Sequence, residues 1–576
     1  MSQSSKDDAV VVDVQHNDEN INSASSNDDL SQISCTSSSK TPPPKPAAYC
    51  SRSQLIIATV AVVGFICLAF IPPLYLANDA TISRTAAVVV LVAGGWVSEI
   101  VELGVSSLIP VVAFPLLQVI SVQDVASQYF THISFLFLGG FALALALQKA
   151  NLHKRISLLA VKAARGSPVL ILIAVSFVCF FLSAFISNTA AALAVLPNAV
   201  SVLKQLDPHG KNPAVTNIYG KCLFLIVAWS CSIGGIATIV GSPPNMSLPQ
   251  VLQSQFPDIP SDMVPNFTSW FVFSAPFAFL FLICLNISFL RAAKKATKAM
   301  KEVQKDDIEE GINSSKDSMV NVFATQLKNL GSLTFEEKVV GVAFLITALL
   351  WSCRTSWFGI GDGWAGIFPE PSFMSDAIPA MLVPLILFFI PSKAVPEKEG
   401  EKYHRVLNWA TMAKVPYNLL FLFGAGFSMS YAFNESGLST YLGNQLVAFE
   451  NLPLFFIVYF ICQTASLISE VTSNTSAALT LLPIIAGLAR AIEIHPLMLM
   501  VPATLSCSCA FMLISATPPN SIVFASKEVV GLKVSDMAKR GFFLSIFGNF
   551  AVAVYSVLFL PTVFGFKPME FPDWAK

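Results

Sequence analysis

The sequence predicts an all-α polytopic membrane protein built around an inverted repeat. Three observations predict this fold class: the composition, a series of long apolar runs, and a polar phrase that occurs twice. Of the 576 residues, 54% are hydrophobic and 12% are charged, and the mean hydropathy is +0.64. Soluble domains usually have about 25% charged residues, so this chain has too few charges to cover a soluble protein of its size.

Long apolar runs indicate how often the chain crosses the membrane. One crossing takes roughly 20 residues as a helix. We therefore expect about eleven transmembrane helices plus two re-entrant hairpins. The apolar runs lie at 55–70, 86–97, 169–186, 222–240, 271–290, 339–350, 377–390, 454–468, 497–514 and 542–564.

The first fifty residues differ from the rest of the chain. They are rich in Ser, Asp and Asn and end in Thr41-Pro42-Pro43-Pro44, a composition typical of disorder. They contain neither an Arg-rich transit peptide nor an early apolar signal sequence, so we expect a plasma-membrane protein. The net charge of −1 predicts no nucleic-acid partner.

The charges of the connections predict the orientation of the chain. Lys and Arg gather in four connections, at 149–165, 291–305, 393–414 and 527–540, and the connections between them are acidic or poor in cations. Because Lys and Arg accumulate on the cytoplasmic side, we expect a cytoplasmic N-terminus and an external C-terminus.

The repeated phrase is SNTAAALAVLP at 187–197 and SNTSAALTLLP at 473–483. A second matched pair precedes it, FLFLGGFALALALQKANL from Phe135 and FLFGAGFSMSYAFNESGL from Phe421. Both pairs have the same offset, since 473 − 187 and 421 − 135 are each 286. The two copies therefore align without an insertion over this stretch.

The third matched pair is GSPPN at 241–245 and ATPPN at 516–520, and one member of it follows each SNT phrase. The connection after the first FLF segment is basic, whereas its counterpart carries Glu435 and Glu450. The two copies should therefore face opposite ways across the membrane. Inverted repeats with broken helices are typical of transporters whose binding site lies near the middle of the membrane.

The chemistry of the repeated phrases predicts a site for a cation and an anion. Paired prolines cannot continue a helix, and the carbonyl groups that they free must line a cavity or hold an ion. We expect each SNT phrase at the tip of a re-entrant hairpin. Carbonyl, amide and hydroxyl oxygens suit Na⁺, and helix N-termini suit an anion. Neither phrase contains Lys, Arg or His, so bound cations should supply the countercharge for a carboxylate.

These motifs resemble those of the divalent anion/sodium symporter family, the solute carrier family 13 group, which includes sodium-coupled dicarboxylate and citrate carriers. The resemblance rests on the paired SNT phrases, on GGIATIVGSPPN from Gly234 and on FMLISATPPNSIVF from Phe511. It extends from about Leu55 to the end of the chain. It implies a homodimer in which a transport domain moves like an elevator against a scaffold.

The resemblance also implies the residues of the site. One Na⁺ would bind Ser183, Ser187, Asn188 and the backbone of Gly241, and a mirrored one would bind Ser469, Ser473, Asn474 and the backbone of Ala516. The substrate carboxylates would contact Asn188, Thr189, Ser242 and Pro243 on one side and Asn474, Thr475, Thr517 and Pro518 on the other. Citrate-preferring animal members tend to have Val where this chain has Thr475, which favours C4 dicarboxylates.

The same resemblance divides the chain into parts. After a cytoplasmic tail at 1–50, it implies scaffold and the start of the first repeat at 51–148, the first hairpin and broken helix of the transport domain at 149–290, a cytoplasmic loop at 291–333, scaffold and the start of the second repeat at 334–452, the second hairpin and broken helix at 453–525, and a last helix with an external C-terminus at 526–576.

The expected function is Na⁺-coupled import of succinate, malate or fumarate, without an organic cofactor. Two alternatives stay open on the same fold: a carrier of citrate, sulfate or phosphate, and a Na⁺-independent dicarboxylate exchanger. An enzyme is disfavoured, because the repeated phrases hold no HExxH motif, nucleophile elbow or acid pair. Glu470, beside the second SNT phrase, is either a proton or cation relay or a structural partner, and the structural role is favoured because the first copy has Ala184 there. His153 is interpreted as a loop residue near the cytoplasmic face.

Overall fold

The computed structural model describes residues 51–206, 214–309, 324–355, 363–395, 404–446 and 451–576. The described residues are helical apart from turns, connections and one isolated antiparallel bridge between Pro391 and Arg405. The predicted tail at 1–50 lies outside them, as do parts of the predicted loops at 291–333 and 393–414.

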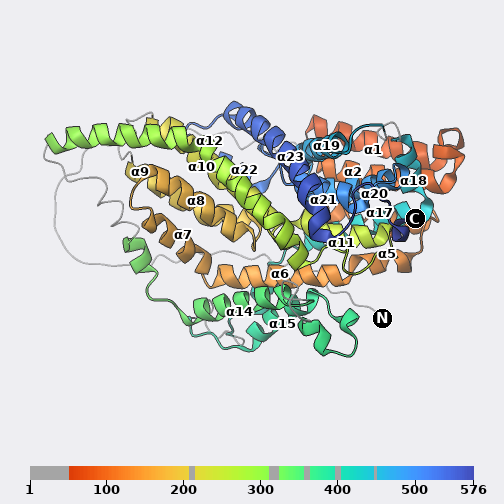
Figure 1. The fold of residues 1–576 in the computed structure, drawn as a ribbon, viewed down its shortest axis with the longest axis horizontal. Coiled ribbons are helices and arrows are strands. Elements are labelled where there is room, and N and C mark those ends of the chain that lie inside the picture. Colours follow the sequence, from red (N-terminus) through yellow and green to blue (C-terminus); the bar gives the residue numbers. More distant parts are fainter. Residues whose placement is uncertain (1–50, 207–213, 310–323, 356–362, 396–403, 447–450) are drawn as a thin grey trace, which may run out of the picture. The chain divides into compact units, whose positions relative to one another are not determined.

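Ten α-helices of the described chain lie outside the two sets of helices that carry the SNT and PPN phrases. They are α1 (Arg52–Phe70), α2 (Ala80–Ser98), α3 (Leu103–Ser106), α4 (Ile109–Leu116), α5 (Val122–Tyr129), α6 (His132–Lys149), α14 (Phe335–Ser352), α15 (Ala377–Phe389), α16 (Trp409–Met412) and α17 (Tyr417–Ser436). Helices α14 and α15 lie along α6 (Figure 1) and both contact it. The approach of α15 is so close that a Cβ on Gly139 would lie 2.1 Å from the carbonyl oxygen of Ala380.

Two sets of six helices follow the same order along the chain. The first set is α7 (Leu152–Ala163), α8 (Pro168–Ser183), α9 (Asn188–Leu206), α10 (Gly220–Ile236), α11 (Pro243–Gln255) and α12 (Phe267–Glu309), with a π-helical turn at Ala214–Tyr219 before α10. The second set is α18 (Leu438–Gln445), α19 (Leu454–Val471), α20 (Asn474–Ala491), α21 (Pro496–Cys507), α22 (Pro518–Ala525) and α23 (Val534–Phe564).

The packing within the two sets is also the same. Helix α8 packs on α9, α10 and α12, and its counterpart α19 packs on α20, α21 and α23. One helix of each set packs on the other set: α22 packs on α9 and α10, and α11 packs on α20 and α21. Each helix that begins with a PPN phrase thus contacts the SNT helix of the opposite copy, and the two copies share one buried core.

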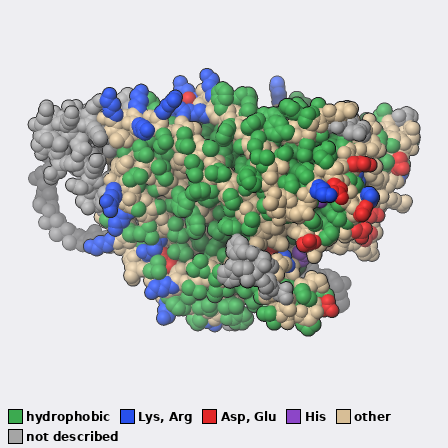
Figure 2. Space-filling view, viewed as in Figure 1, with side chains coloured by type: hydrophobic (Ala, Val, Ile, Leu, Met, Phe, Trp, Pro, Cys, Tyr) green, Lys and Arg blue, Asp and Glu red, His purple; other side chains and the backbone are tan. Residues whose placement is uncertain are grey.

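Eight helices among the described residues are long and apolar enough to cross a membrane, and four further apolar helices are shorter. The expected number of about eleven crossings plus two hairpins therefore stays a prediction. Figure 2 shows hydrophobic side chains over the middle of the visible face, with Lys and Arg toward one end and Asp and Glu toward the other. This separation agrees with the alternating connections from which the orientation is predicted.

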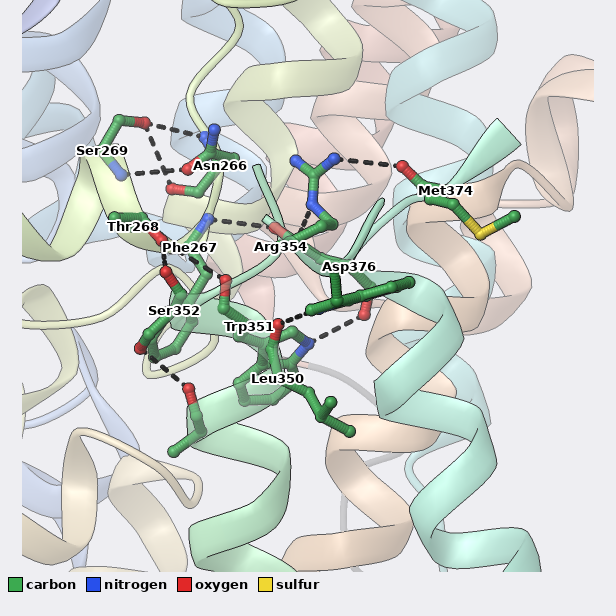
Figure 3. A network of polar contacts seen from close by, with 12 residues as sticks. Asn266, Phe267, Thr268, Ser269, Leu350, Trp351, Ser352, Arg354, Met374 and Asp376 are labelled. Carbon is green, nitrogen blue, oxygen red and sulfur yellow. Dashed lines mark hydrogen bonds and ion pairs between the residues drawn. The ribbon is translucent and has the colours of Figure 1, made fainter. Parts of the chain in front are cut away.

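A polar network ties the beginning of α12 to the end of α14 and the beginning of α15 (Figure 3). The carboxylate of Asp376 accepts hydrogen bonds from Arg354 Nε (2.5 Å) and from the backbone N–H of Phe267 (3.0 Å). Its backbone carbonyl accepts a hydrogen bond from Trp351 Nε1 (2.8 Å). Since a buried carboxylate is costly without partners, this network joins the first six-helix set to the helices that follow it.

Candidate functional site

Both SNT phrases lie where one helix ends and the next begins. Helix α8 ends at Ser183 and α9 begins at Asn188, while α19 ends at Val471 and α20 begins at Asn474. The serine before each new helix caps it: the hydroxyl of Ser187 accepts from the N–H of Ala190 (3.3 Å), and that of Ser473 accepts from the N–H of Ser476 (3.1 Å). Serine is favoured there because the first N–H groups of a helix have no partner within it.

Both PPN phrases begin new helices after a non-helical stretch. Helix α10 ends at Ile236 and α11 begins at Pro243, and α21 ends at Cys507 and α22 begins at Pro518. Proline fits the first turn of a helix because the N–H that it lacks would have no partner there. The paired prolines thus interrupt each apolar run as the sequence predicts, and they leave 237–242 and 508–517 unwound.

The asparagine of each PPN phrase holds the unwound stretch beside it. The Nδ2 of Asn245 donates to the carbonyl oxygens of Gly235 and Thr238, both at 2.9 Å. The Nδ2 of Asn520 donates to the carbonyl of Leu513 (2.9 Å) and more weakly to that of Ala510 (3.5 Å). The donor and both acceptor residues occupy equivalent positions in the two copies, since 520 − 245, 510 − 235 and 513 − 238 are each 275.

Glu470 also supports an unwound stretch. Its two carboxylate oxygens accept hydrogen bonds from the backbone N–H groups of Met512 and Leu513, each at 2.8 Å. The side chain is 2% exposed, and these bonds satisfy it. This geometry agrees with the predicted structural role of Glu470, and the equivalent position in the first copy is Ala184.

One cavity of about 770 Å³ brings the repeated phrases together. Four helices, α9, α11, α20 and α22, begin at this cavity, and their first residues Asn188, Pro243, Asn474 and Pro518 line it. Helix N-termini carry about half a positive charge each, so the cavity wall attracts an anion. Every residue predicted to contact substrate lines the cavity: Asn188, Thr189, Ser242, Pro243, Asn474, Thr475, Thr517 and Pro518.

Oxygen atoms of the first copy surround a small space beside Gly235 and Gly241. A Cβ added to Gly235 would lie 2.6 Å from Oδ1 and 3.2 Å from Nδ2 of Asn188, and 3.2 Å from the carbonyl oxygen of Gly241. A Cβ added to Gly241 would lie 2.8, 2.9 and 3.1 Å from the carbonyl oxygens of Gly235, Ala184 and Ser183. Such a cluster of oxygens is the ligand type that hard cations prefer, so these residues fit Na⁺.

Two of the four predicted serine ligands, Ser183 and Ser469, are not among the residues that line the cavity. Ser183 donates from its hydroxyl to Oδ1 of Asn188. In the second copy Ser469 donates to Oδ1 of Asn474 (2.7 Å) and to the carbonyl of Cys507 (2.6 Å). Ser187, Gly241, Ser473 and Ala516 line the cavity itself.

The two oxygen clusters differ in one respect. The positions equivalent to Gly235 and Gly241 are Ala510 and Ala516, which carry methyl groups. The first copy therefore has no side chain at two positions where the second copy has a methyl group. The sequence shows this difference once the PPN phrases are aligned at their offset of 275.

Three of the cavity-lining residues outside the repeated phrases have basic side chains, and none of the three was predicted as a site residue. Lys154 and Lys414 are exposed and line the cavity, and both belong to connections predicted to be cytoplasmic. His153 lines it as well, and the expectation of a loop residue was wrong, since His153 is buried within α7. Burial lowers the pKa of His153, so its ring is neutral at neutral pH and the two lysines supply the charge.

We expect the double substitution Lys154→Ala and Lys414→Ala to weaken succinate binding about fivefold at low ionic strength, because two exposed cations no longer attract the anion. The difference should vanish at high salt, where exposed charges are screened. Binding of labelled succinate to the purified protein at fixed Na⁺, with choline chloride added, measures both effects. Lys162→Ala is the control, since Lys162 is exposed on α7 and does not line the cavity.

The comparison with known families identifies the protein class. The family described as "Sodium:sulfate symporter transmembrane region" matches residues 52–565. This chain belongs to the sodium:sulfate symporter family. Membership confirms the resemblance stated from the motifs, and it makes the chain an integral membrane protein and a transporter of a sodium-coupled anion family rather than an enzyme.

Known members of the family are similar over most of their length. Solute carrier family 13 member 2 of Rattus norvegicus is 33% identical, over 92% of this chain and 96% of that protein. The sodium-dependent dicarboxylate transporter SdcS of Staphylococcus saprophyticus is 32% identical, over 83% and 86%. The Na⁺/dicarboxylate cotransporter 3 of Homo sapiens is 32% identical, over 85% and 90%.

A solved structure shares the fold of this symporter. The structure of MtrF from Neisseria gonorrhoeae, described as an antimetabolite efflux pump, aligns with a TM-score of 0.51 over 88% of this chain and 94% of that one. Because the two sequences are 14% identical, this likeness concerns the fold alone. It agrees with an all-helical protein of many membrane spans.

Proposed function

We propose that this protein is a Na⁺-coupled symporter that imports C4 dicarboxylates such as succinate, malate and fumarate. The observation that supports it most is the cavity at which four helices begin and which both SNT phrases line. The repeated phrases around it contain no Lys, Arg or His. Two relatives named for sodium-dependent dicarboxylate transport, from Staphylococcus saprophyticus and Homo sapiens, support the substrate class.

The two carboxylates of the substrate would bind at opposite sides of the cavity. Each side offers an amide, two hydroxyls and the first N–H groups of an SNT helix, and these groups are hydrogen-bond donors to a carboxylate. The PPN helices begin with two prolines, which have no N–H, so they contribute the positive ends of their dipoles. The proposed contacts are Asn188, Thr189, Ser242 and Pro243 on the first side and Asn474, Thr475, Thr517 and Pro518 on the second.

Two Na⁺ ions would bind next to the substrate and supply the missing positive charge. The oxygens around Gly235 and Gly241 support the first site, which would be formed by Ser183, Ser187, Asn188 and the backbone of Gly241. The second would be formed by Ser469, Ser473, Asn474 and the backbone of Ala516.

The membrane potential explains why such coupling is needed. Moving a dianion into an inside-negative cell costs about 4.6 kcal/mol per 100 mV. Two Na⁺ ions cancel this cost, and a third would make import favourable.

Transport would occur by an elevator motion in a homodimer with a cytoplasmic N-terminus. The moving part would consist of residues 149–290 and 453–525, which contain α7 to the first half of α12 and α19 to α22, and the scaffold of residues 51–148 and 334–452, which contain α1 to α6 and α14 to α18. The cavity lies between these parts, since it is also lined by Phe141 of α6 and Phe344 of α14. Substrate held by the moving part would thus slide past a fixed wall.

Uptake into liposomes tests the proposal. We expect purified protein to take up labelled succinate when a Na⁺ gradient is imposed and to stop when K⁺ replaces Na⁺. Unlabelled malate and fumarate should compete, and sulfate, phosphate and citrate should compete weakly. Equal uptake in Na⁺ and K⁺ would instead favour an exchanger, and strong inhibition by sulfate, phosphate or citrate would favour another anion as the substrate.

A further inference from the structure

A second cavity of about 410 Å³ lies between α12 and α23. It shares no lining residue with the substrate cavity. Its walls include Cys284, Ile287 and Ser288 from α12 and Arg540 and Phe543 from α23. Trp229 of α10 contributes to its lining as well.

The walls of this groove face outward and are apolar. Phe543 is 72% exposed and Ile287 is 58% exposed. Both belong to helices that are long and apolar enough to cross the membrane, so their exposed faces suit hydrocarbon rather than water. A ligand of this groove therefore needs an apolar portion that lies between the two helices.

The floor of the groove contains a polar group without a partner. Trp229 is 1% exposed, and its indole N–H has no hydrogen-bond acceptor among the described residues. Buried indole N–H groups usually have an acceptor. Trp229 lines the groove, so a ligand there lies beside this indole ring.

One end of the groove is positively charged. Arg540 donates from Nη1 to the sulfur of Cys222 (3.2 Å) and lies over the ring of Phe289 (5.4 Å to the centroid). The nearby Asp536 pairs with Lys221 (2.8 Å) and also interacts electrostatically with Arg540, but no ion pair of Arg540 is found in the described part of the chain. The guanidinium is thus available to an anion.

Two further basic residues lie on α12 beyond the part of this helix that lines the groove. Residues spaced by three or four share one face of a helix, so Cys284, Ser288, Arg291 and Lys295 form one stripe. Arg291 and Lys295 are exposed. The groove itself is lined by Arg540, and Arg291 and Lys295 follow Ser288 by three and seven residues on this stripe of α12.

We propose that this groove binds an anionic phospholipid. The phosphate contacts Arg540 together with the basic residues of α12, one acyl chain lies between α12 and α23 along Phe543, and an ester carbonyl accepts the N–H of Trp229. A soluble anion fits less well, because the groove opens on the apolar face of the protein. The basic end belongs to connections predicted to be cytoplasmic, where membranes carry anionic lipids.

Titration of the purified full-length protein in detergent with phosphatidylglycerol, followed by native mass spectrometry, tests this proposal. Arg540→Ala should weaken binding of the first lipid about fivefold, since one basic residue near a lipid surface contributes about that factor. Arg540→Lys should retain most of it. Trp229→Phe keeps the ring and removes the donor, and it should weaken binding about threefold. Lys162→Ala, the same loss of charge on an exposed part of α7, is the control.

Modification of Cys284 gives a second readout that does not depend on Arg540. Cys284 is exposed and lines the groove, so phosphatidylglycerol should slow its reaction with a maleimide, as followed by peptide mapping. Phosphatidylcholine and inorganic phosphate should protect it much less. The proposal is overturned if phosphatidylcholine protects equally, if phosphate alone protects, or if Arg540→Ala and Trp229→Phe bind phosphatidylglycerol as tightly as Lys162→Ala.

Discussion

Gly235→Ala is expected to raise the Na⁺ concentration that half-saturates succinate uptake about tenfold while the protein stays folded. The added methyl would lie 2.6 Å from Oδ1 of Asn188, so this side chain must leave the oxygen cluster. The methyl group meets the end of a side chain before any backbone atom, and alanine favours the helix of which Gly235 is part by about 1 kcal/mol. Loss of one ligand worth about 1.4 kcal/mol lowers Na⁺ affinity tenfold.

The initial rate of uptake as a function of Na⁺ concentration measures this effect. Two variants serve as matched controls. Gly140 lines the same cavity with nothing within 4 Å of an added Cβ, so Gly140→Ala should transport normally. Ala510→Gly changes the mirrored position in the opposite direction, and it should not reduce Na⁺ dependence. A normal Na⁺ response of Gly235→Ala would mean that the oxygens beside Gly235 do not bind Na⁺.

Asn188→Asp and Asn474→Asp are expected to separate cation binding from anion transport. Each substitution keeps an oxygen at the ligand position and adds a negative charge. A unit charge about 4 Å from another contributes about 4 kcal/mol at an effective dielectric constant of 20. The added charge should therefore strengthen Na⁺ binding and repel a dicarboxylate, and we expect succinate uptake to fall by about a hundredfold or more.

Two measurements distinguish these effects. Thermal stabilisation of the purified variants by Na⁺ should appear at the same or a lower concentration than in the wild type, while liposomes measure uptake. Asn418→Asp adds the same charge at an exposed residue of the cavity wall and should have a smaller effect. If both variants transport succinate at the wild-type rate, the substrate does not lie between Asn188 and Asn474.

Much of this protein could be predicted from its sequence, because the decisive signals are local. Paired prolines in an apolar run interrupt a helix wherever the run lies, and they do so before Pro243 and Pro518. The serine before Asn474 caps a helix by its own side chain. The two copies share one offset between FLF and SNT, so the repeat and the family were both recognisable from the printed residues.

Only the tertiary structure decided what meets at the cavity. The contacts of α11 with the second copy and of α22 with the first join residues that are far apart in the chain, and no local pattern encodes that exchange. No local pattern shows that Lys154 and Lys414 line the cavity either. In the sequence they resemble other basic residues of the connections. Helix starts and interruptions depend on residues that are neighbours in the chain. The space between helices depends on how all the packed side chains fill it.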